Sequence, residues 1–223
     1  MNEAKNNEDE GRPGVLAVWN DCAPGEETVY EEWYRTEHLL ERVRVPGFRA
    51  GWRYMAIEGS PQYFTHYETD SVNVLFSNAY REQLDTPTEL TQRVMSGVFI
   101  HATRAVCERI ACFGELRGAL VAVMRQPEGA PLANLRSIAD TAFRESDDAV
   151  RAEAWLRWAD PVEGLSSEQS IRGPDATVAG AVMIQCPTEA GGRDAFERLR
   201  SMAPADGEVG LYRALCALHR PDC

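Results

Sequence analysis

Apolar residues recur along the chain in short runs and at helical spacing, and turn-forming residues separate these segments. The most marked segment is residues 29–48, VYEEWYRTEHLLERVRVPGF, where apolar positions at helical spacing alternate with charged ones. Pro46 and Gly47 end this predicted helix. The apolar run at residues 15–19 predicts a buried strand, so the chain opens with a strand followed by an amphipathic helix.

Three more strands and a second helical region complete the first half. Strands are predicted at residues 48–58, 62–69 and 99–113. Helix is predicted at 72–97 with a break near Pro87, because proline disfavours helix at the residue before it. Side chains alternate across a strand, which predicts one face with Tyr63, Thr65, Tyr67 and Thr69 and an opposite face with Phe64, His66 and Glu68.

The same order of elements then appears a second time. The second half predicts strands at 119–125, 150–158, 177–185 and 209–219, helices at 131–144 and 192–202, and a polar loop at 160–175. Each half reads β-α-β-β-α-β, the ferredoxin-like arrangement. We therefore expect an α+β fold of two tandem ferredoxin-like repeats, residues 14–113 and 118–220, after a disordered tail at 1–13. Each repeat leaves one apolar sheet face bare, and packing sheet to sheet would close an intramolecular barrel.

Composition limits the classes of partner. Lys and Arg number 23 against 35 Asp and Glu, and the resulting formal charge of −12 argues against binding to nucleic acid or to anionic membranes. No apolar run approaches the roughly 20 residues of a membrane span. The acidic N-terminal residues lack the apolar core of a secretory signal, so a cytoplasmic protein is expected. The six cysteines form no C-x-x-C pair, and free thiols are expected.

Several short motifs of the first half resemble the dimeric α/β-barrel superfamily, and its EthD-like and stress-responsive branches in particular. They are WYRTEHL at residues 33–39, VPGF at 45–48, YFTHYE at 63–68 and SNAY at 77–80. The predicted helix of the second half at this position has no histidine, tryptophan or tyrosine. The resemblance therefore implies a fused pseudo-dimer with one elaborated site, in the first half. The superfamily includes polyketide cyclases, isomerases, dehydratase-like proteins, cofactor-free monooxygenases and haem enzymes.

The resemblance implies that His38 carries acid–base chemistry, and the position of Glu37 on the same helix makes it a second candidate. On a regular helix the buried stripe would comprise Val29, Trp33, Thr36, Leu40 and Val43. Glu37 borders that stripe, where partial desolvation would raise its pKa, and the alternative is an ion pair with Arg53 or Arg104. On the same regular helix His38 lies far from the buried stripe, which favours the alternative of a solvent-facing histidine.

His66 is a third catalytic candidate, since it shares a strand face with Phe64 and Glu68 at a position where the resemblance implies an aliphatic residue; a core histidine is the alternative. His101 could approach His66. The two histidines and Glu68 have the composition of a metal site, but no local motif supports one, and no metal is predicted. Aromatic residues on the strands and helix could line a pocket for a planar compound or form ordinary core. The predicted substrate-binding residues are Trp19, Tyr34, Trp52, Tyr54, Tyr63, Tyr67 and His101.

Three functions fit the sequence. The first is a cofactor-independent enzyme of cyclase, isomerase or dehydratase type acting on an apolar carbonyl or phenolic compound. The second is a monooxygenase, cofactor-free or dependent on haem bound through His66 or His101. The third is a non-catalytic barrel that binds a metabolite or assembles with itself, and the sheet edges leave a homodimer open. No cofactor is expected, and haem is the alternative.

Overall fold

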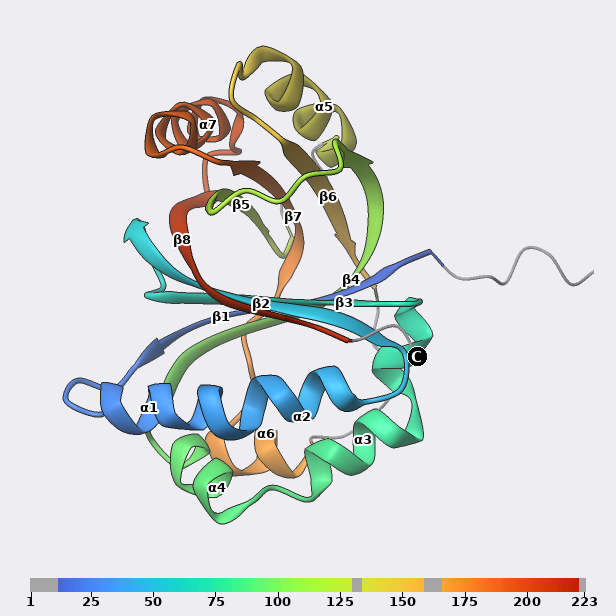
Figure 1. Cartoon of the computed structure of the whole chain (residues 1–223), viewed down its shortest axis with the longest axis vertical. Coiled ribbons are helices and arrows are strands. Elements are labelled where there is room, and N and C mark those ends of the chain that lie inside the picture. The colour runs from blue at the N-terminus through green and yellow to red at the C-terminus, as the bar shows by residue number, and fades with distance from the viewer. Residues whose placement is uncertain (1–11, 130–133, 159–165, 221–223) are drawn as a thin grey trace, which may run out of the picture.

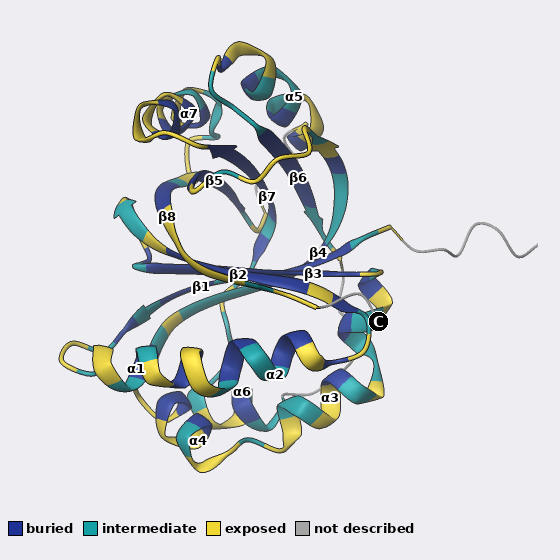
Figure 2. Cartoon of the chain, viewed as in Figure 1, coloured by how far each residue is buried: buried dark blue, intermediate teal, exposed yellow. Residues whose placement is uncertain are grey.

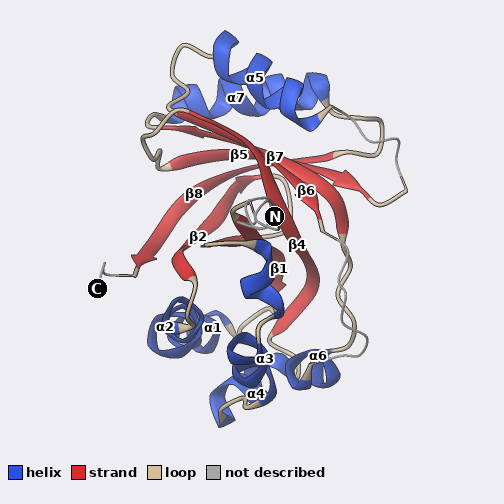
Figure 3. Cartoon of the chain, turned by 90° about the vertical axis from the view of Figure 1, so that its right-hand side faces the viewer, coloured by secondary structure: helices blue, strands red, loops and turns tan. Residues whose placement is uncertain are grey.

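The computed structural model describes residues 12–129, 134–158 and 166–220. Within them, eight strands form one closed barrel whose neighbours all pair antiparallel, in the order β1-β3-β2-β8-β5-β7-β6-β4 (Figure 3). The strands are β1 Gly14–Cys22, β2 Phe48–Glu58, β3 Tyr63–Thr69, β4 Phe99–Phe113, β5 Leu120–Pro127, β6 Arg151–Arg157, β7 Val178–Cys186 and β8 Glu208–His219. The expected α+β class and barrel closure are confirmed.

Each half contributes four consecutive strands of the barrel, β4-β1-β3-β2 and β8-β5-β7-β6. Two antiparallel seams join the halves, one between β2 and β8 and the other between β4 and β6. The strand order is therefore the same in both halves. That the halves descend from one duplicated unit stays a prediction.

The helices form two layers outside the barrel. The helices and helical turns of the described residues are α1 Glu27–Trp33, a π-helical turn Tyr34–His38, α2 Leu39–Arg44, a 3₁₀ turn Val72–Phe76, α3 Asn78–Asp85, α4 Glu89–Met95, α5 Leu135–Glu145, α6 Ser167–Arg172 and α7 Glu189–Met202. Helices α5 and α7 cover one side, and α1 to α4 cover the other (Figure 1). Helix α6 belongs to the second half of the chain but lies with the first-half helices.

Barrel closure buries most of β1, β3, β5 and β7 on both faces, whereas β8 is largely exposed toward its end (Figure 2). On β3, Tyr63 and Tyr67 pack in the core beneath α1 to α4, whereas Phe64 packs inside the barrel. The predicted alternation along this strand is confirmed. A third core lies under α5 and α7.

The predicted boundaries differ from the structure in a few places. The segment 160–175, predicted as a loop, contains α6, whose Ser166 and Gln169 form a capping box. The predicted helix break near Pro87 is confirmed as the gap between α3 and α4. Pro131 and most of the predicted tail lie outside the described residues. No helix in the described part of the chain is long and apolar enough to cross a bilayer.

Helix α2 lies close against β2 at Gly51. A Cβ atom built there would lie 2.8 Å from Leu39 Cδ1 and 2.8 Å from Tyr67 Cδ1. Because both neighbours are buried, neither has room to move away. The small size of Gly51 therefore sets the distance between the helix that carries the candidate site and the sheet.

We predict that Gly51→Ala lowers the free energy of unfolding by about 1–3 kcal/mol through overpacking. Gly97→Ala is the matched control, because nothing lies within 4 Å of the corresponding Cβ position. Its effect should stay within about 0.5 kcal/mol. Urea denaturation of both variants measures the difference, and equal stability of the two would contradict the close approach of α2.

Candidate functional site

A π-helical turn directs His38 toward the sheet. The backbone N–H of Leu39 donates to the Tyr34 carbonyl, five residues back, in place of the usual four. The wider turn places Trp33 and His38 over one another, with ring centroids 4.0 Å apart. His38 is consequently 8% exposed, whereas Thr36 is exposed. The predicted regular-helix stripe was wrong at Thr36, since the wheel assumed an even α-helix.

His38 lines a pocket between this helix, the outer face of the sheet and three other helices. The pocket has a volume of about 40 Å³. Its polar lining includes Arg42 of α2, Tyr67 of β3, Tyr80 of α3 and Glu168 of α6. Leucine, valine, methionine and phenylalanine side chains complete the walls. The volume suits one or two water molecules or a single oxygen-bearing group of a ligand.

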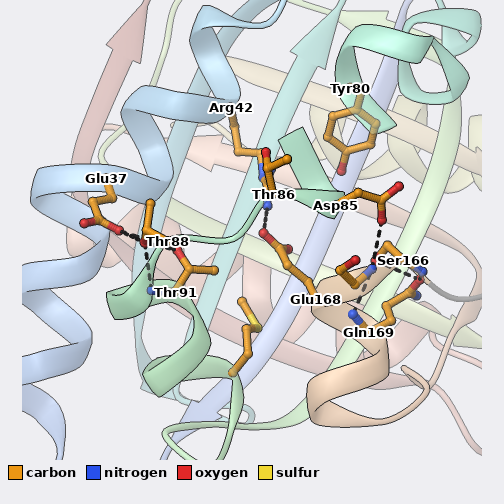
Figure 4. Close-up of polar contacts among 12 residues, drawn as sticks. Glu37, Arg42, Tyr80, Asp85, Thr86, Thr88, Thr91, Ser166, Glu168 and Gln169 are labelled. Atoms are coloured by element: carbon orange, nitrogen blue, oxygen red, sulfur yellow. Dashed lines mark hydrogen bonds and ion pairs between the residues drawn. The ribbon is translucent and has the colours of Figure 1, made fainter. Parts of the chain in front are cut away.

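An ion pair between Arg42 and Glu168 closes one side of this pocket (Figure 4). Arg42 is 2% exposed and Glu168 5%. Burial disfavours the charge on Arg42, but the Glu168 carboxylate outweighs burial and holds the pKa of Arg42 above its ordinary value. The pair brings a side chain of the second half into the site of the first half.

Three of the residues that line the pocket each have a buried polar atom without a partner among the described residues. These atoms are His38 Nδ1, Arg42 Nη1 and Tyr67 Oη. Buried polar groups are nearly always hydrogen-bonded, and leaving one unsatisfied costs about 1–3 kcal/mol. An arginine N–H and a tyrosine hydroxyl both donate, so the arrangement suits an oxygen acceptor from a ligand or water.

The protonation states agree with this role. Burial, followed by the nearby charges of Arg42 and Arg172, lowers the pKa of His38 well below 6.5. Burial is also the main cause that raises the pKa of Tyr67 well above 10. At neutral pH the pocket therefore holds a neutral imidazole, which can accept a proton, beside a phenol that stays protonated and donates.

Glu37 lies on the same helical segment but outside the pocket lining. It accepts a hydrogen bond of 2.6 Å from Thr88 Oγ1, the N-cap residue of α4 (Figure 4). Of the predicted ion-pair partners of Glu37, Arg53 was wrong, because Arg53 donates through both Nη atoms to Glu31. The catalytic prediction for Glu37 is not tested by this geometry.

His66 lies on the other side of the sheet, inside the barrel. It is fully buried, and its ring stacks on Trp52 with centroids 4.8 Å apart. Neither ring nitrogen has a partner among the described residues. Burial, then the nearby arginines, lowers the pKa of His66 well below 6.5. The sheet therefore keeps the two candidate histidines in different cores.

The predicted binding residues divide in the same way. Trp19, Trp52 and Tyr54 pack inside the barrel, whereas Tyr34, Tyr63 and Tyr67 pack under the helices. Of these six, Tyr67 alone lines the pocket of His38.

His101 does not approach His66. It is exposed at the surface with a left-handed backbone (φ 53°), and its Nδ1 lies 2.9 Å from Asp21 Oδ2. The residues that the structure describes contain no group of three or more histidine, cysteine and acidic side chains placed to hold a metal.

Sequence reasoning missed Arg42, Tyr80 and Glu168 as members of the site. Arg42 carried a usable signal, because it follows His38 by four residues on one helix. Glu168 carried none, since its segment reads as a polar loop far along the chain.

No protein-family model matches the sequence, and no curated protein matches it. Two solved structures share its fold at a TM-score of 0.55. An anthrone oxidase-like protein is 9% identical, with 96% of this chain and 95% of that chain covered. A proposed monooxygenase from Fusobacterium nucleatum subsp. nucleatum is 8% identical, with 94% and 95% covered. At this identity the likeness establishes the ferredoxin-like α/β-barrel fold alone.

The burial of neutral His66 predicts a dependence of stability on pH. Its pKa is lower when folded than when unfolded, so stability is complete above the unfolded value near 6.5 and is lost as the pH falls below it. His66→Phe should remove up to about 1.4 kcal/mol per pH unit from this slope. Urea denaturation between pH 7 and pH 5 measures the slope, and a variant with the wild-type slope would contradict a neutral buried His66.

Proposed function

We propose that the protein is a small-molecule enzyme that removes a proton from an enolisable carbonyl or phenolic compound in the pocket of His38. The observation that carries the proposal is that three residues lining one pocket each hold a buried polar atom without a partner among the described residues, namely His38 Nδ1, Arg42 Nη1 and Tyr67 Oη. A carbonyl or phenolic oxygen is the acceptor that the two donors lack.

Each residue has a distinct role in the proposed step. The substrate oxygen accepts hydrogen bonds from Arg42 and Tyr67, and the neutral imidazole of His38 takes the proton. Negative charge then develops on the substrate oxygen, where the guanidinium of Arg42 stabilises it. The lowered pKa makes His38 a weak base, so transfer depends on this stabilisation of the anion as it forms.

Glu168 supports the step as a positioning residue. Its ion pair engages Arg42 through Nη2, which leaves Nη1 without a partner among the described residues. Since both side chains are buried, the ion pair keeps Arg42 charged and holds its guanidinium group in place. The active site therefore depends on both halves of the chain.

An oxygenase is the second candidate. The names of the two structural neighbours, an anthrone oxidase-like protein and a proposed monooxygenase, favour it. Removal of the same proton would give an electron-rich anion, which could then react with dioxygen. The two candidates differ in the step after proton removal: the isomerase or cyclase type returns or redirects the proton, and the oxygenase consumes oxygen.

Haem does not fit the pocket of His38, whose volume of about 40 Å³ is far below that of the macrocycle. His66 is enclosed by aromatic side chains and offers no space at its ring nitrogens. We therefore derive no step through haem. Placement near the EthD-like branch, origin from a duplicated unit and cytoplasmic location are further proposals that rest on the sequence.

The proton-transfer role predicts a measurable exchange reaction. A panel of small 1,3-diketones in deuterated buffer should exchange its acidic C–H faster with the protein present, as followed by NMR. His38→Ala should slow the catalysed exchange about 100-fold or more, and Tyr67→Phe about tenfold. Glu37→Gln is the matched control on the same helical segment and should keep the wild-type rate. If Glu37→Gln lost the exchange activity and His38→Ala kept it, Glu37 and not His38 would be the base.

The oxygenase candidate predicts oxygen consumption that depends on the same residue. With a small phenolic compound whose oxygen-bearing group enters the pocket, the purified protein should take up oxygen, and His38→Ala should abolish most of that uptake. Uptake that His38→Ala leaves intact would count against this candidate. An absorbance scan accompanies the measurement, and a Soret band in the purified protein would replace the cofactor-free mechanism with a haem-dependent one. If the protein catalysed neither proton exchange nor oxygen uptake with any compound tested, the non-catalytic barrel would be favoured.

A further inference from the structure

A cluster of five charged side chains closes one end of the barrel. Glu68 of β3 and Glu153 of β6 lie among Arg109, Arg117 and Arg151, and we call these five the barrel-end cluster. Arg117 Nη2 donates to Glu68 at 2.6 Å, and Arg151 Nε donates to Glu153 at 2.5 Å. Arg109 and Arg117 each lie within 4 Å of both carboxylates.

The barrel-end cluster has more positive than negative charge. Three guanidinium groups face two carboxylates, and Glu153 is fully buried. Arg109 Nη1 lies 3.3 Å from Glu68 Oε1 but makes no hydrogen bond. Arg117 is exposed, so solvent offsets part of this excess, but the buried Nη1 of Arg109 remains an unused donor, which is costly unless something compensates it. The excess is unexpected in a chain whose net charge is −12.

A groove of about 680 Å³ opens beside this cluster. Its lining includes Glu68, Arg117 and Trp52, together with His219 and Arg220 at the end of β8. The Arg117 guanidinium carbon lies 4.4 Å above the centroid of the Trp52 ring. Arg220 donates to the Val45 carbonyl and has no carboxylate partner among the described residues. The groove shares no lining residue with the pocket of His38.

We propose that this groove binds a small organic carboxylate, held by Arg117 and Arg220. The planar fork of a guanidinium matches a carboxylate with two parallel hydrogen bonds. The anion would offset the excess positive charge of the barrel-end cluster. A volume of this size is typical of small-ligand sites, and the apolar walls formed by Trp52 and Phe48 suit the carbon skeleton.

Calorimetric titration of the full chain with benzoate tests the proposal, and neutral benzamide is the matched probe. We expect benzoate to bind with submillimolar affinity and benzamide not to bind. Arg117→Gln should weaken benzoate binding about tenfold, as expected for one charge-assisted contact. Arg220→Gln should weaken it severalfold, and Arg93→Gln, an exposed arginine of α4, should leave it unchanged.

Two further comparisons separate this site from its alternatives. His38→Ala should leave benzoate affinity unchanged, whereas loss of binding in that variant would place benzoate in the pocket of the proposed enzyme and overturn the second site. If Arg117→Gln fails to fold, Arg220→Gln becomes the test, because Arg220 is exposed and is not a member of the barrel-end cluster. Equal binding of benzamide, or wild-type affinity in Arg220→Gln, would show that the cluster only closes the barrel.

Discussion

Closure of the eight-stranded barrel is the constraint on which the other features depend. The seams β2–β8 and β4–β6 leave the sheet with an inner and an outer face, and two layers of helices cover much of the outer one. A polar side chain on a covered part of a strand cannot turn to solvent, so it must find a partner or stay neutral. His66 and Tyr67, adjacent on β3, show both consequences: each is buried and unpartnered, and they lie in separate cores.

The site also depends on a contact that crosses from one half to the other. Helix α6 extends from the second half over the helical layer of the first, and Glu168 reaches Arg42 there. The second half lacks the histidine-bearing helix of the first, yet it supplies the carboxylate that fixes the buried cation. Removing one member of such a pair would leave a buried charge uncompensated, at a cost of roughly 3–5 kcal/mol. The halves are thus unequal in chemistry although equal in strand order.

Hydrophobic periodicity was sufficient to predict the element order, the strand faces of β3 and the break before Pro87, because those depend on local spacing. It failed at His38, since a helical wheel assumes even turns and the π turn at Tyr34–His38 adds a residue. It also failed at α6, a six-residue polar helix that packs against α3 and α4 and reaches α2 through the ion pair of Glu168 with Arg42. Of the site residues that the sequence missed, Glu168 is brought to Arg42 by a tertiary contact over more than a hundred residues of chain.

Comparison of the two buried histidines explains why one and not the other is assigned a catalytic role. Both are neutral and both have unpartnered ring nitrogens. His66 is enclosed by aromatic rings, and burial and then the nearby arginines disfavour a cation there. Burial and the nearby arginines disfavour a cation at His38 too, but His38 lines a pocket together with a guanidinium and a phenol. In a low dielectric, proton transfer is favoured where the resulting charges are stabilised, and in our proposal Arg42 and Tyr67 stabilise the anion that forms beside His38.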